Sequence, residues 1–402
     1  MSSPPTPAAP AAPGAAPVSL ARRSLAPDLA RGFMLLVIAT VHAHMFRQFS
    51  TGGGETFALT GTLDTVVTAF MLMFAESRGY PMFAALFGYG LAQIVLRRGA
   101  EGHGTAWVRS LVRRRGRWLM VIGFLHTLLL FYGDIIGVYG LIALAFAGLL
   151  WAGDRRLLAH GFAWMSVGSL LYAAAMAAAF SGTDPRQESA AELTPLTDML
   201  MRLGAWPVML VLMTLVSVFP FTVGVWAARR RLLEEPERHL ALLRRVALVG
   251  IPVAALGGIP QALLAIEVWP SGFPPAFGAG WLHVLSGYAG GFGYAALIAL
   301  VAVRIGDRRG PVVQALAATG QRSMTCYLLQ SVAWVVLFLP YTLDLAPGLS
   351  DAAAVLVGAA VWLATVVVAD LMRRARLRGP AEAFLRRRTY GPPVRAADTA
   401  SR

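Results

Sequence analysis

The chain has 402 residues, of which 57% are hydrophobic and only 14% are charged, and its mean hydropathy is +0.61. A soluble domain carries about 25% charged residues, so this composition excludes an ordinary soluble protein and indicates that lipid surrounds the chain. The net charge of +14 comes from 35 basic residues, all of them arginine. These arginines lie between apolar runs instead of covering one face of a domain, and this distribution argues against binding to nucleic acid.

The N-terminal segment 1–27 is rich in proline and alanine and holds no apolar stretch that could form the core of a signal peptide. Its composition predicts a disordered cytoplasmic tail, and residues 392–402 are predicted to form a second one after a membrane domain over 28–391. The first apolar run, 29–49, follows three arginines, so we expect it to enter the membrane from the cytoplasm as an uncleaved helix.

Apolar runs long enough to cross a bilayer, about 20 residues each, recur along the chain. Nine of them are clear, namely 29–49, 118–132, 135–152, 157–180, 205–228, 246–267, 281–303, 323–343 and 352–372. The region 57–96 is less clear, because it is interrupted by Asp64, Glu76, Arg78 and Pro81.

Parity settles the interpretation of this region. The seven arginines between Arg97 and Arg117 place the following loop inside, so an odd number of crossings must lie within 57–96. We therefore predict one span over 80–96, preceded by an interfacial or re-entrant segment over 57–75.

The sequence as a whole predicts an all-α, polytopic membrane helix bundle of about ten transmembrane helices, with eleven as the alternative and with both termini in the cytoplasm. Under this topology the arginine-rich segments 154–156, 229–245 and 304–309 lie inside, whereas the acidic loop 183–202 lies outside.

Polar residues at membrane depth are costly, so those inside the predicted spans are candidate functional residues. In the first span, RGFMLLVIATVHAH, Arg31 lies at the cytoplasmic end and His42 lies eleven residues further, about 16 Å deeper at the helical rise. A histidine at that depth can accept a proton from a hydroxyl or amine, and an arginine at the mouth can hold a phosphate. In the alternative interpretation His42 bonds a neighbouring helix and Arg31 anchors the topology. His44 points about 200° away from His42 and is predicted to be a packing residue.

The third span, RWLMVIGFLHTLLLFYGDIIGVYG, contributes His126 near mid-depth as a second candidate catalytic residue. Asp134 follows in the outer turn. It is expected to cap the next helix, or alternatively to contribute to an outward-facing acceptor site.

The ninth span, GQRSMTCYLLQSVAW, adds three candidate substrate-binding residues, Arg322 at the inner mouth and Tyr327 and Gln330 deeper in the membrane. Gln330 needs a partner, because an unpaired amide in hydrocarbon costs several kcal/mol. It either bonds a neighbouring helix or orients a substrate carbonyl. Cys326, the one cysteine, is expected to be a small core residue.

Four segments, taken in order, resemble the YeiB-like family of bacterial membrane proteins of unknown function: RGFMLLVIATVH, MFAALFGYGLAQ, GFLHTLLLFYGDIIGVYGL and GQRSMTCYLLQSVAW with the closing RGPAEAFLRRRTYG. The resemblance covers about residues 25–391. It implies a multi-pass protein of the bacterial cytoplasmic (plasma) membrane. That family looks related to transmembrane acyltransferases, which move an acyl group from cytoplasmic acyl-CoA to an acceptor on the other face.

The resemblance also implies residue roles. Membrane acyltransferases of that group carry an arginine and a histidine separated by ten residues in the first helix, and Arg31 and His42 reproduce this spacing. YeiB-like proteins often have asparagine where this chain has His42, a departure that favours chemistry here. They usually have asparagine at the position of Cys326 as well, which leaves that position without an implied role.

We therefore expect a transmembrane acyltransferase that uses acyl-CoA as donor and a small extracytoplasmic acceptor. The alternatives are a membrane transporter or exporter of a small molecule, in which the histidines relay protons, and a non-catalytic member of the family. No bound cofactor and no metal are expected, because no HExxH, CxxC, Walker or GxGxxG pattern stands in a suitable context. The lipid bilayer and a small-molecule substrate are the expected partners, and the sequence does not indicate an oligomeric state.

Overall fold

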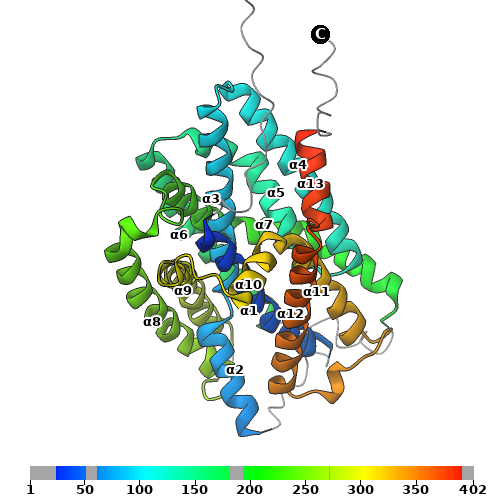
Figure 1. The fold of residues 1–402 in the computed structure, drawn as a ribbon. Helices are drawn as coiled ribbons and strands as arrows, with labels where there is room; N and C mark the ends of the chain where they lie inside the picture. Colours follow the sequence, from blue (N-terminus) through cyan, green and yellow to red (C-terminus); the bar gives the residue numbers. More distant parts are fainter. Residues whose placement is uncertain (1–23, 51–60, 182–192, 271, 392–402) are drawn as a thin grey trace, which may run out of the picture.

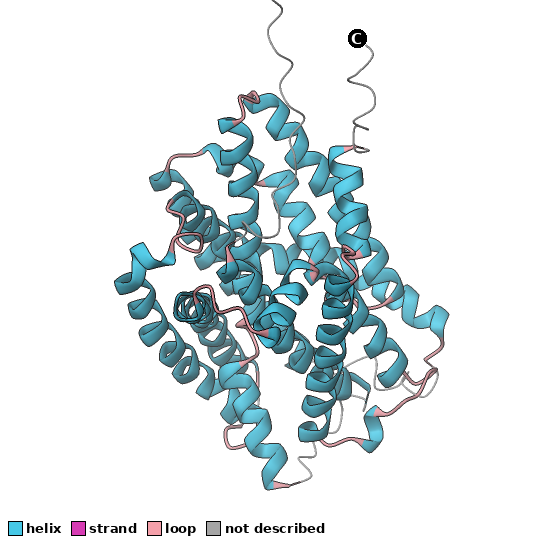
Figure 2. Cartoon of the chain, viewed as in Figure 1, coloured by secondary structure: helices cyan, strands magenta, loops and turns pink. Residues whose placement is uncertain are grey.

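The computed structural model describes residues 24–50, 61–181, 193–270 and 272–391, and over these ranges the chain is helical without any strand (Figure 2). Residues 1–23 of the predicted N-terminal tail 1–27, and the whole predicted tail 392–402, lie outside the described residues. The first helix begins at Leu25, within the segment assigned to the N-terminal tail.

Thirteen α-helices make up the described part of the chain (Figure 1). They are α1 (Leu25–Ser50), α2 (Thr62–Phe74), α3 (Gly79–Ala100), α4 (Thr105–Leu129), α5 (Ile136–Ala145), α6 (Asp154–Ser181), α7 (Pro195–Arg229), α8 (Leu240–Ala265), α9 (Phe273–Ile305), α10 (Pro311–Gln321), α11 (Ser323–Phe338), α12 (Asp351–Arg374) and α13 (Pro380–Tyr390). Short 3₁₀ turns lie at Ala147–Trp151, Pro236–His239 and Ala346–Gly348.

Seven segments of the described residues are long and apolar enough to cross a membrane, and they lie on α1, on α2 with α3, and on α6, α7, α8, α9 and α12. Two more apolar helices, α5 and α11, are shorter. Large apolar side chains also face outward on several of these helices, with Leu256 exposed by 65% and Leu356 by 70%. This is the surface expected where lipid is the solvent, so the architecture is that of a multi-pass membrane protein.

The predicted spans overlap these helices with differences at three places. The span 118–132 begins inside α4, because the arginine-rich stretch before it is helical from Thr105 onward. The span 135–152 divides into α5 and a 3₁₀ turn, and the span 323–343 extends beyond the end of α11 at Phe338. The total of ten crossings and the cytoplasmic location of the termini stay predictions.

The region expected to hold an interfacial segment forms instead the first part of a broken helix. From Thr62 onward α2 and α3 run one after the other from the lower to the upper end of the molecule, and together they form one candidate span of 39 residues (Figure 1). The break lies at residues 75–78, where Ser77 has a φ of 57°. The number of crossings in this region stays a prediction.

The first helix, α1, occupies the middle of the bundle and packs against α3, α9, α10, α11 and α12. Glycines permit the closest of these approaches, because a Cβ atom on Gly32 would collide with the backbone of Leu316, and one on Gly320 with the backbone of Asp28. Small residues at helix contacts are typical of membrane bundles. The central place of α1 brings its polar residues next to those of α4 and α11.

Two helices, α10 and α13, were not expected from hydropathy. Each has 11 residues and is too short for a span, and each begins with a proline preceded by a glycine. Proline is favoured in the first turn of a helix, where its missing N–H costs nothing. These helices join and anchor the longer ones.

Candidate functional site

His126 lies in the last turn of α4 and is held between a carboxylate and a hydroxyl. Its Nδ1 atom is 3.0 Å from Oδ1 of Asp134, an ion-pair distance, although the ring N–H is not aligned with that oxygen as in a regular hydrogen bond. Its Nε2 atom is 2.8 Å from Oγ of Ser331 in α11. All three side chains are buried. A carboxylate, an imidazole and a hydroxyl in this order can move a proton from the hydroxyl to the imidazole.

The turn between α4 and α5 positions the carboxylate. Asp134 accepts hydrogen bonds from the backbone N–H groups of Ile136 and Gly137, at 3.0 and 2.5 Å, and so caps the first turn of α5. Gly123 in α4 leaves room for this carboxylate, because a Cβ atom there would collide with Asp134 and with the backbone of Gly137. Asp134 therefore caps α5, as the sequence indicated, and faces His126 with the same carboxylate.

A second histidine and two aromatic rings surround this group. The ring centroid of His42, from α1, lies 4.7 Å from that of Phe131 and 6.1 Å from that of Tyr327. The Tyr327 ring is in turn 5.1 Å from the His126 ring, and the two imidazoles are close enough to interact electrostatically. The structure thus brings His42, His126, Asp134 and Tyr327 together from four predicted segments.

Several buried polar atoms near this group have no hydrogen-bond partner among the described residues. The Tyr139 hydroxyl of α5 is one of them, and it interacts electrostatically with Tyr327 and Asp134. On the buried face of α11 the Gln330 carbonyl and the Trp334 indole N–H are two others. The Gln330 amide donates only a long bond of 3.4 Å to Thr365. Buried polar groups are normally paired, so these are groups that a polar ligand can satisfy.

The N-terminus of α11 is fixed by the C-terminal helix α13. Glu382 accepts hydrogen bonds from the backbone N–H groups of Met324 and Thr325, at 2.8 and 3.1 Å, and from the Thr325 hydroxyl at 2.5 Å. A carboxylate at a helix N-terminus satisfies free N–H groups and complements the helix dipole. The closing GPAEAFLRR segment therefore sets the position of the helix that carries Tyr327 and Ser331.

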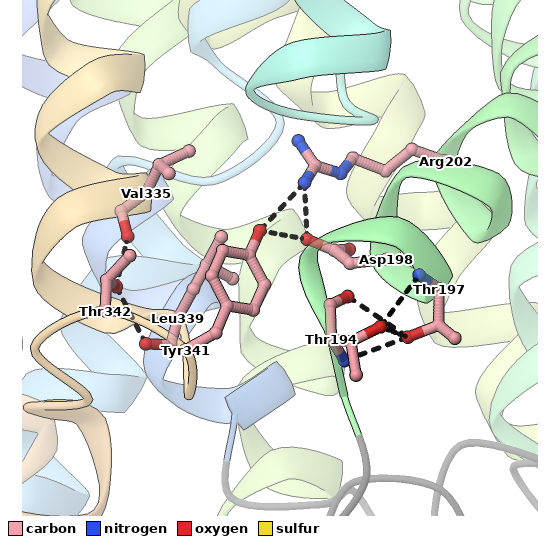
Figure 3. Close-up of polar contacts among 8 residues, drawn as sticks. All are labelled: Thr194, Thr197, Asp198, Arg202, Val335, Leu339, Tyr341 and Thr342. Carbon is pink, nitrogen blue, oxygen red and sulfur yellow. Dashed lines mark hydrogen bonds and ion pairs between the residues drawn. The ribbon is translucent and has the colours of Figure 1, made fainter.

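The chain just beyond the other end of α11 is fixed by a polar cluster that Figure 3 shows. The Tyr341 hydroxyl donates to Asp198 Oδ2 at 2.7 Å and accepts from Arg202 Nη2 at 3.0 Å. Arg202 also donates to Asp198, one turn earlier on α7. Arg202 is buried, so the ion pair is shielded from solvent and holds α7 against the turn after α11.

Arg31 lies on the same face of α1 as His42. It stands at the opposite end of that helix, near the arginines of α4. Its guanidinium is 3.4 Å from Asp28, and it lies close enough to Arg115 to interact electrostatically. Burial lowers the pKa of Arg115, and Arg31 lowers it further, while Tyr390 and Glu382 raise it. A small pocket of about 140 Å³ opens beside Asp28 between α1, α10 and α12. This end of the bundle is therefore rich in positive charge.

Arg322 lies apart from the histidine group, at the junction of α10 and α11. It is buried and donates to the backbone carbonyls of Ala318 and Leu377, at 3.1 and 2.6 Å. These bonds hold the segment between α12 and α13. Cys326, four residues further along the chain, is fully buried with its thiol 3.9 Å from a backbone carbonyl, in keeping with a core residue.

His44 differs from its expected packing role, because it belongs to a buried chain of charges. Its Nδ1 atom is 3.2 Å from Glu76, and its Nε2 atom is 3.6 Å from Asp351 at the start of α12. Asp351 pairs with Arg47 and accepts from Thr68 at 3.1 Å. The 200° separation around α1 thus directs His44 toward this second polar group and away from His126.

Arg78 continues this chain at the break between α2 and α3. Its side chain is fully buried, donates to the Glu76 backbone carbonyl at 2.5 Å, and lies 3.0 Å from Nδ1 of His283. Gly258 of α8 and Gly290 of α9 make room for it, since a Cβ atom at either position would lie 2.8 Å from the side chain of Arg78. The charges that interrupt the predicted span are therefore paired inside the protein.

Three of these features were not identified from the sequence: Ser331, the Glu382 cap and the Arg78 chain. Ser331 stands four residues after Tyr327, so a helical projection places both on one face. This spacing was the feature of the sequence that could have identified Ser331. Among the described residues, no group of three or more His, Cys, Asp and Glu side chains lies close enough to hold a metal ion.

Comparisons with known proteins agree with the family resemblance. Residues 227–392 match the model of a family described as "Protein of unknown function (DUF418)". The uncharacterized protein YxaH of Bacillus subtilis is 26% identical over 90% of this chain and 93% of its own length. The uncharacterized protein YeiB of Escherichia coli is 37% identical over 20% of this chain and 18% of its own length. No solved structure is significantly similar. The chain is thus similar to YxaH and YeiB, and its C-terminal part matches the DUF418 family model.

Proposed function

We propose that this protein transfers an acyl group from cytoplasmic acyl-CoA to an extracytoplasmic hydroxyl or amine. The observation that carries the proposal is the position of His126, buried between Asp134 and Ser331 and next to His42. Acyl transfer to a hydroxyl or amine needs a base that removes one proton as the new bond forms. An imidazole in an apolar site keeps the neutral form that can do so.

The charge distribution along α1 supports the choice of donor. Arg31 and Arg115 lie at the end of the bundle that the arginine-rich segments place inside, where the phosphates of acyl-CoA would arrive. His42 is about 16 Å further along the same face of α1. A thioester at the end of a long flexible arm can therefore reach the histidines while its phosphates stay at the mouth.

The tests are donor binding and thioester consumption by the protein in lipid nanodiscs. We expect Arg31→Ala to weaken acyl-CoA binding, because it removes a phosphate ligand. We expect His126→Ala to bind the donor normally and to consume thioester about 10²- to 10⁴-fold more slowly, the usual contribution of a general base. His160→Ala is the matched control, since His160 is exposed and bonds only its own helix.

Equal thioester consumption by wild type and His126→Ala would refute the proposal, as would failure of the wild type to bind any acyl-CoA. His42→Ala tells whether the second imidazole takes part. A loss of rate with unchanged binding assigns it to the reaction.

Proton-coupled transport is a second candidate, and a separate observation favours it. The broken helix α2–α3 carries the half-buried Glu76, which contacts His44, and His44 contacts Asp351; Arg78 beside them donates to the Glu76 backbone carbonyl. Broken helices with ionisable groups near mid-membrane are common in secondary transporters. Proton uptake into proteoliposomes that responds to Glu76→Gln but not to His126→Ala would favour transport over acyl transfer.

A further inference from the structure

The hydroxyl of the buried Ser331 lies within hydrogen-bond distance of His126, and the proposed acyl transfer assigns no chemical step to it. We infer that Ser331 is the nucleophile, which carries the acyl group as a covalent ester between donor and acceptor. This inference rests on the proposed acyl transfer and goes one step further, because it divides the reaction into two half-reactions. A direct transfer, by contrast, would use His126 without any covalent intermediate.

The first argument is the order of the three side chains. Ser331 Oγ is 2.8 Å from Nε2 of His126, and Nδ1 on the other side of the ring is 3.0 Å from Asp134. A negative carboxylate beside Nδ1 favours the tautomer with its proton on Nδ1. Nε2 is then free to accept the proton of the serine hydroxyl. This arrangement of acid, base and nucleophile is recognised by geometry, whatever the order along the chain.

The second argument concerns the ordinary role of a serine in a membrane helix. Such a serine usually donates to the carbonyl four residues earlier, and Ser331 does lie 3.2 Å from the carbonyl of Tyr327. The contact with His126 is shorter by 0.4 Å, the difference between 3.2 and 2.8 Å. The serine proton therefore has its better acceptor in the imidazole.

The third argument is a pair of hydroxyls that can stabilise the negative oxygen of a tetrahedral intermediate. Tyr139 is 92% buried, as its exposed fraction is 8%, and its hydroxyl has no partner among the described residues. Tyr327 stands one turn before Ser331, and its hydroxyl lies 3.4 Å from the Gly133 carbonyl and also contacts the backbone of Ile135. Tyrosine hydroxyls serve as oxyanion donors, and in a site without water each such donor contributes strongly.

The steps balance without any further reactant. Ser331 Oγ attacks the thioester carbonyl and its proton passes to His126 Nε2; the C–S bond then breaks and the CoA sulfur leaves with that proton. The acceptor hydroxyl or amine next attacks the ester carbonyl and gives its proton to His126. The C–O bond to the serine breaks, and Oγ recovers the proton. The aromatic rings of Phe131 and Tyr327 enclose the site, so the acyl group enters as these rings or α11 move aside.

The experiment mixes the protein in nanodiscs with acetyl-CoA, or in a second run with palmitoyl-CoA, and omits any acceptor. Released CoA is measured, and the acid-quenched protein is analysed by intact mass and peptide mass spectrometry. We expect one acyl group per chain, located on Ser331, and a burst of CoA equal to the amount of protein. Ser331→Ala should lose the label and slow CoA release by at least about 100-fold. Ser331→Cys should still be labelled, now as a hydroxylamine-sensitive thioester.

Ser217→Ala is the matched control, because Ser217 is likewise fully buried in a membrane helix, α7, and lies outside this group. It should keep both label and burst. CoA release by wild type without any acyl group on Ser331, together with full activity of Ser331→Ala, would overturn the covalent step and leave direct transfer by His126. A wild type that releases no CoA from either donor would instead overturn the acyl-transfer proposal itself.

Discussion

The partners of His126 determine what its imidazole can do. Asp134 on one side fixes the tautomer and stabilises the imidazolium that forms, while Ser331 on the other side offers a proton. His42 lies close by, with its ring packed against those of Phe131 and Tyr327. A single general base with its own carboxylate therefore describes the group better than two equivalent histidines.

Asp134→Asn separates the two roles of this carboxylate. Asparagine keeps only one of the two oxygens that accept from Ile136 and Gly137, so part of the cap should remain at a cost of about 1 kcal/mol, and donor binding should not change. The charge beside Nδ1 is lost, however, and the wrong tautomer of His126 becomes accessible. We expect thioester consumption to fall by about 10²- to 10⁴-fold.

Donor binding of the same Asp134→Asn sample provides the control, since it should match wild type, while thermal unfolding measures the cost of the lost hydrogen-bond acceptor. If turnover is unchanged, Asp134 serves only as a cap. Asp134→Ala, which removes cap and charge together, should lower stability by about 1 kcal/mol in addition.

Four of the five side chains in this group could be identified from the sequence, because a polar residue inside an apolar run has a high free-energy cost in lipid and is therefore a candidate functional residue. His42, His126, Asp134 and Tyr327 were all recognised in this way. Ser331 was not, since a serine can bond its own helix and causes little conflict with lipid. Only the packing of α11 against α4 shows that its hydroxyl meets the imidazole.

The contact between α3 and α7 shows how glycine position controls helix packing. The two glycines of LFGYGLAQ, Gly88 and Gly90, have different surroundings. A Cβ atom on Gly88 would collide with the backbone carbonyl of Phe221 in α7, whereas one on Gly90 would meet only the end of the Arg31 side chain at 3.9 Å. Backbone cannot move aside without separating the helices, whereas a long side chain can.

Gly88→Ala should therefore destabilise the protein by about 1–3 kcal/mol, the usual cost of overpacking. Gly90→Ala should be neutral or slightly stabilising, because alanine favours the helix more than glycine does. Apparent melting temperatures in detergent measure both. Equal melting temperatures for the two variants would contradict the close approach of α3 and α7.

The broken helix α2–α3 shows what hydropathy cannot supply. Glu76 and Arg78 appeared to end a span, because a charge in lipid is costly when it is alone. In the structure Glu76 contacts His44, and Arg78 contacts His283, each on a different helix. These partners come from segments far away along the chain, so neither the continuity of the helix nor the role of His44 could be obtained from local sequence.

Across the whole molecule, long apolar helices and arginine-rich connections define the arrangement in the membrane. Seven segments satisfy length and hydropathy together. The candidate catalytic histidines lie on α1 and α4, and Ser331 lies on the shorter helix α11. The class of fold was predictable because apolar composition is a global property. The number of crossings could not be predicted from the sequence as well as the class of fold, because it depends on short helices that span only part of the bilayer thickness.

Single cysteines can test the ten-span topology, because Cys326 is fully buried and should not react. We expect His103→Cys and Asp307→Cys to be labelled by a membrane-impermeant maleimide only after the inner face is opened. Leu345→Cys and Val268→Cys should be labelled in intact cells, since these exposed side chains follow the predicted spans 323–343 and 246–267 on the side predicted to be outside. The unsubstituted chain is the control. Labelling of positions 103 and 345 from the same face would contradict an odd number of crossings between them.

The most direct measurement is an experimental structure of the protein in nanodiscs with a non-reactive thioether analogue of acyl-CoA. The account places the phosphates beside Arg31 and Arg115 and the sulfur-linked carbonyl within reach of His126 and Ser331. An analogue bound elsewhere, or with its reactive end against the outer lipid-facing surface of α1, would contradict a buried transfer centre at His126.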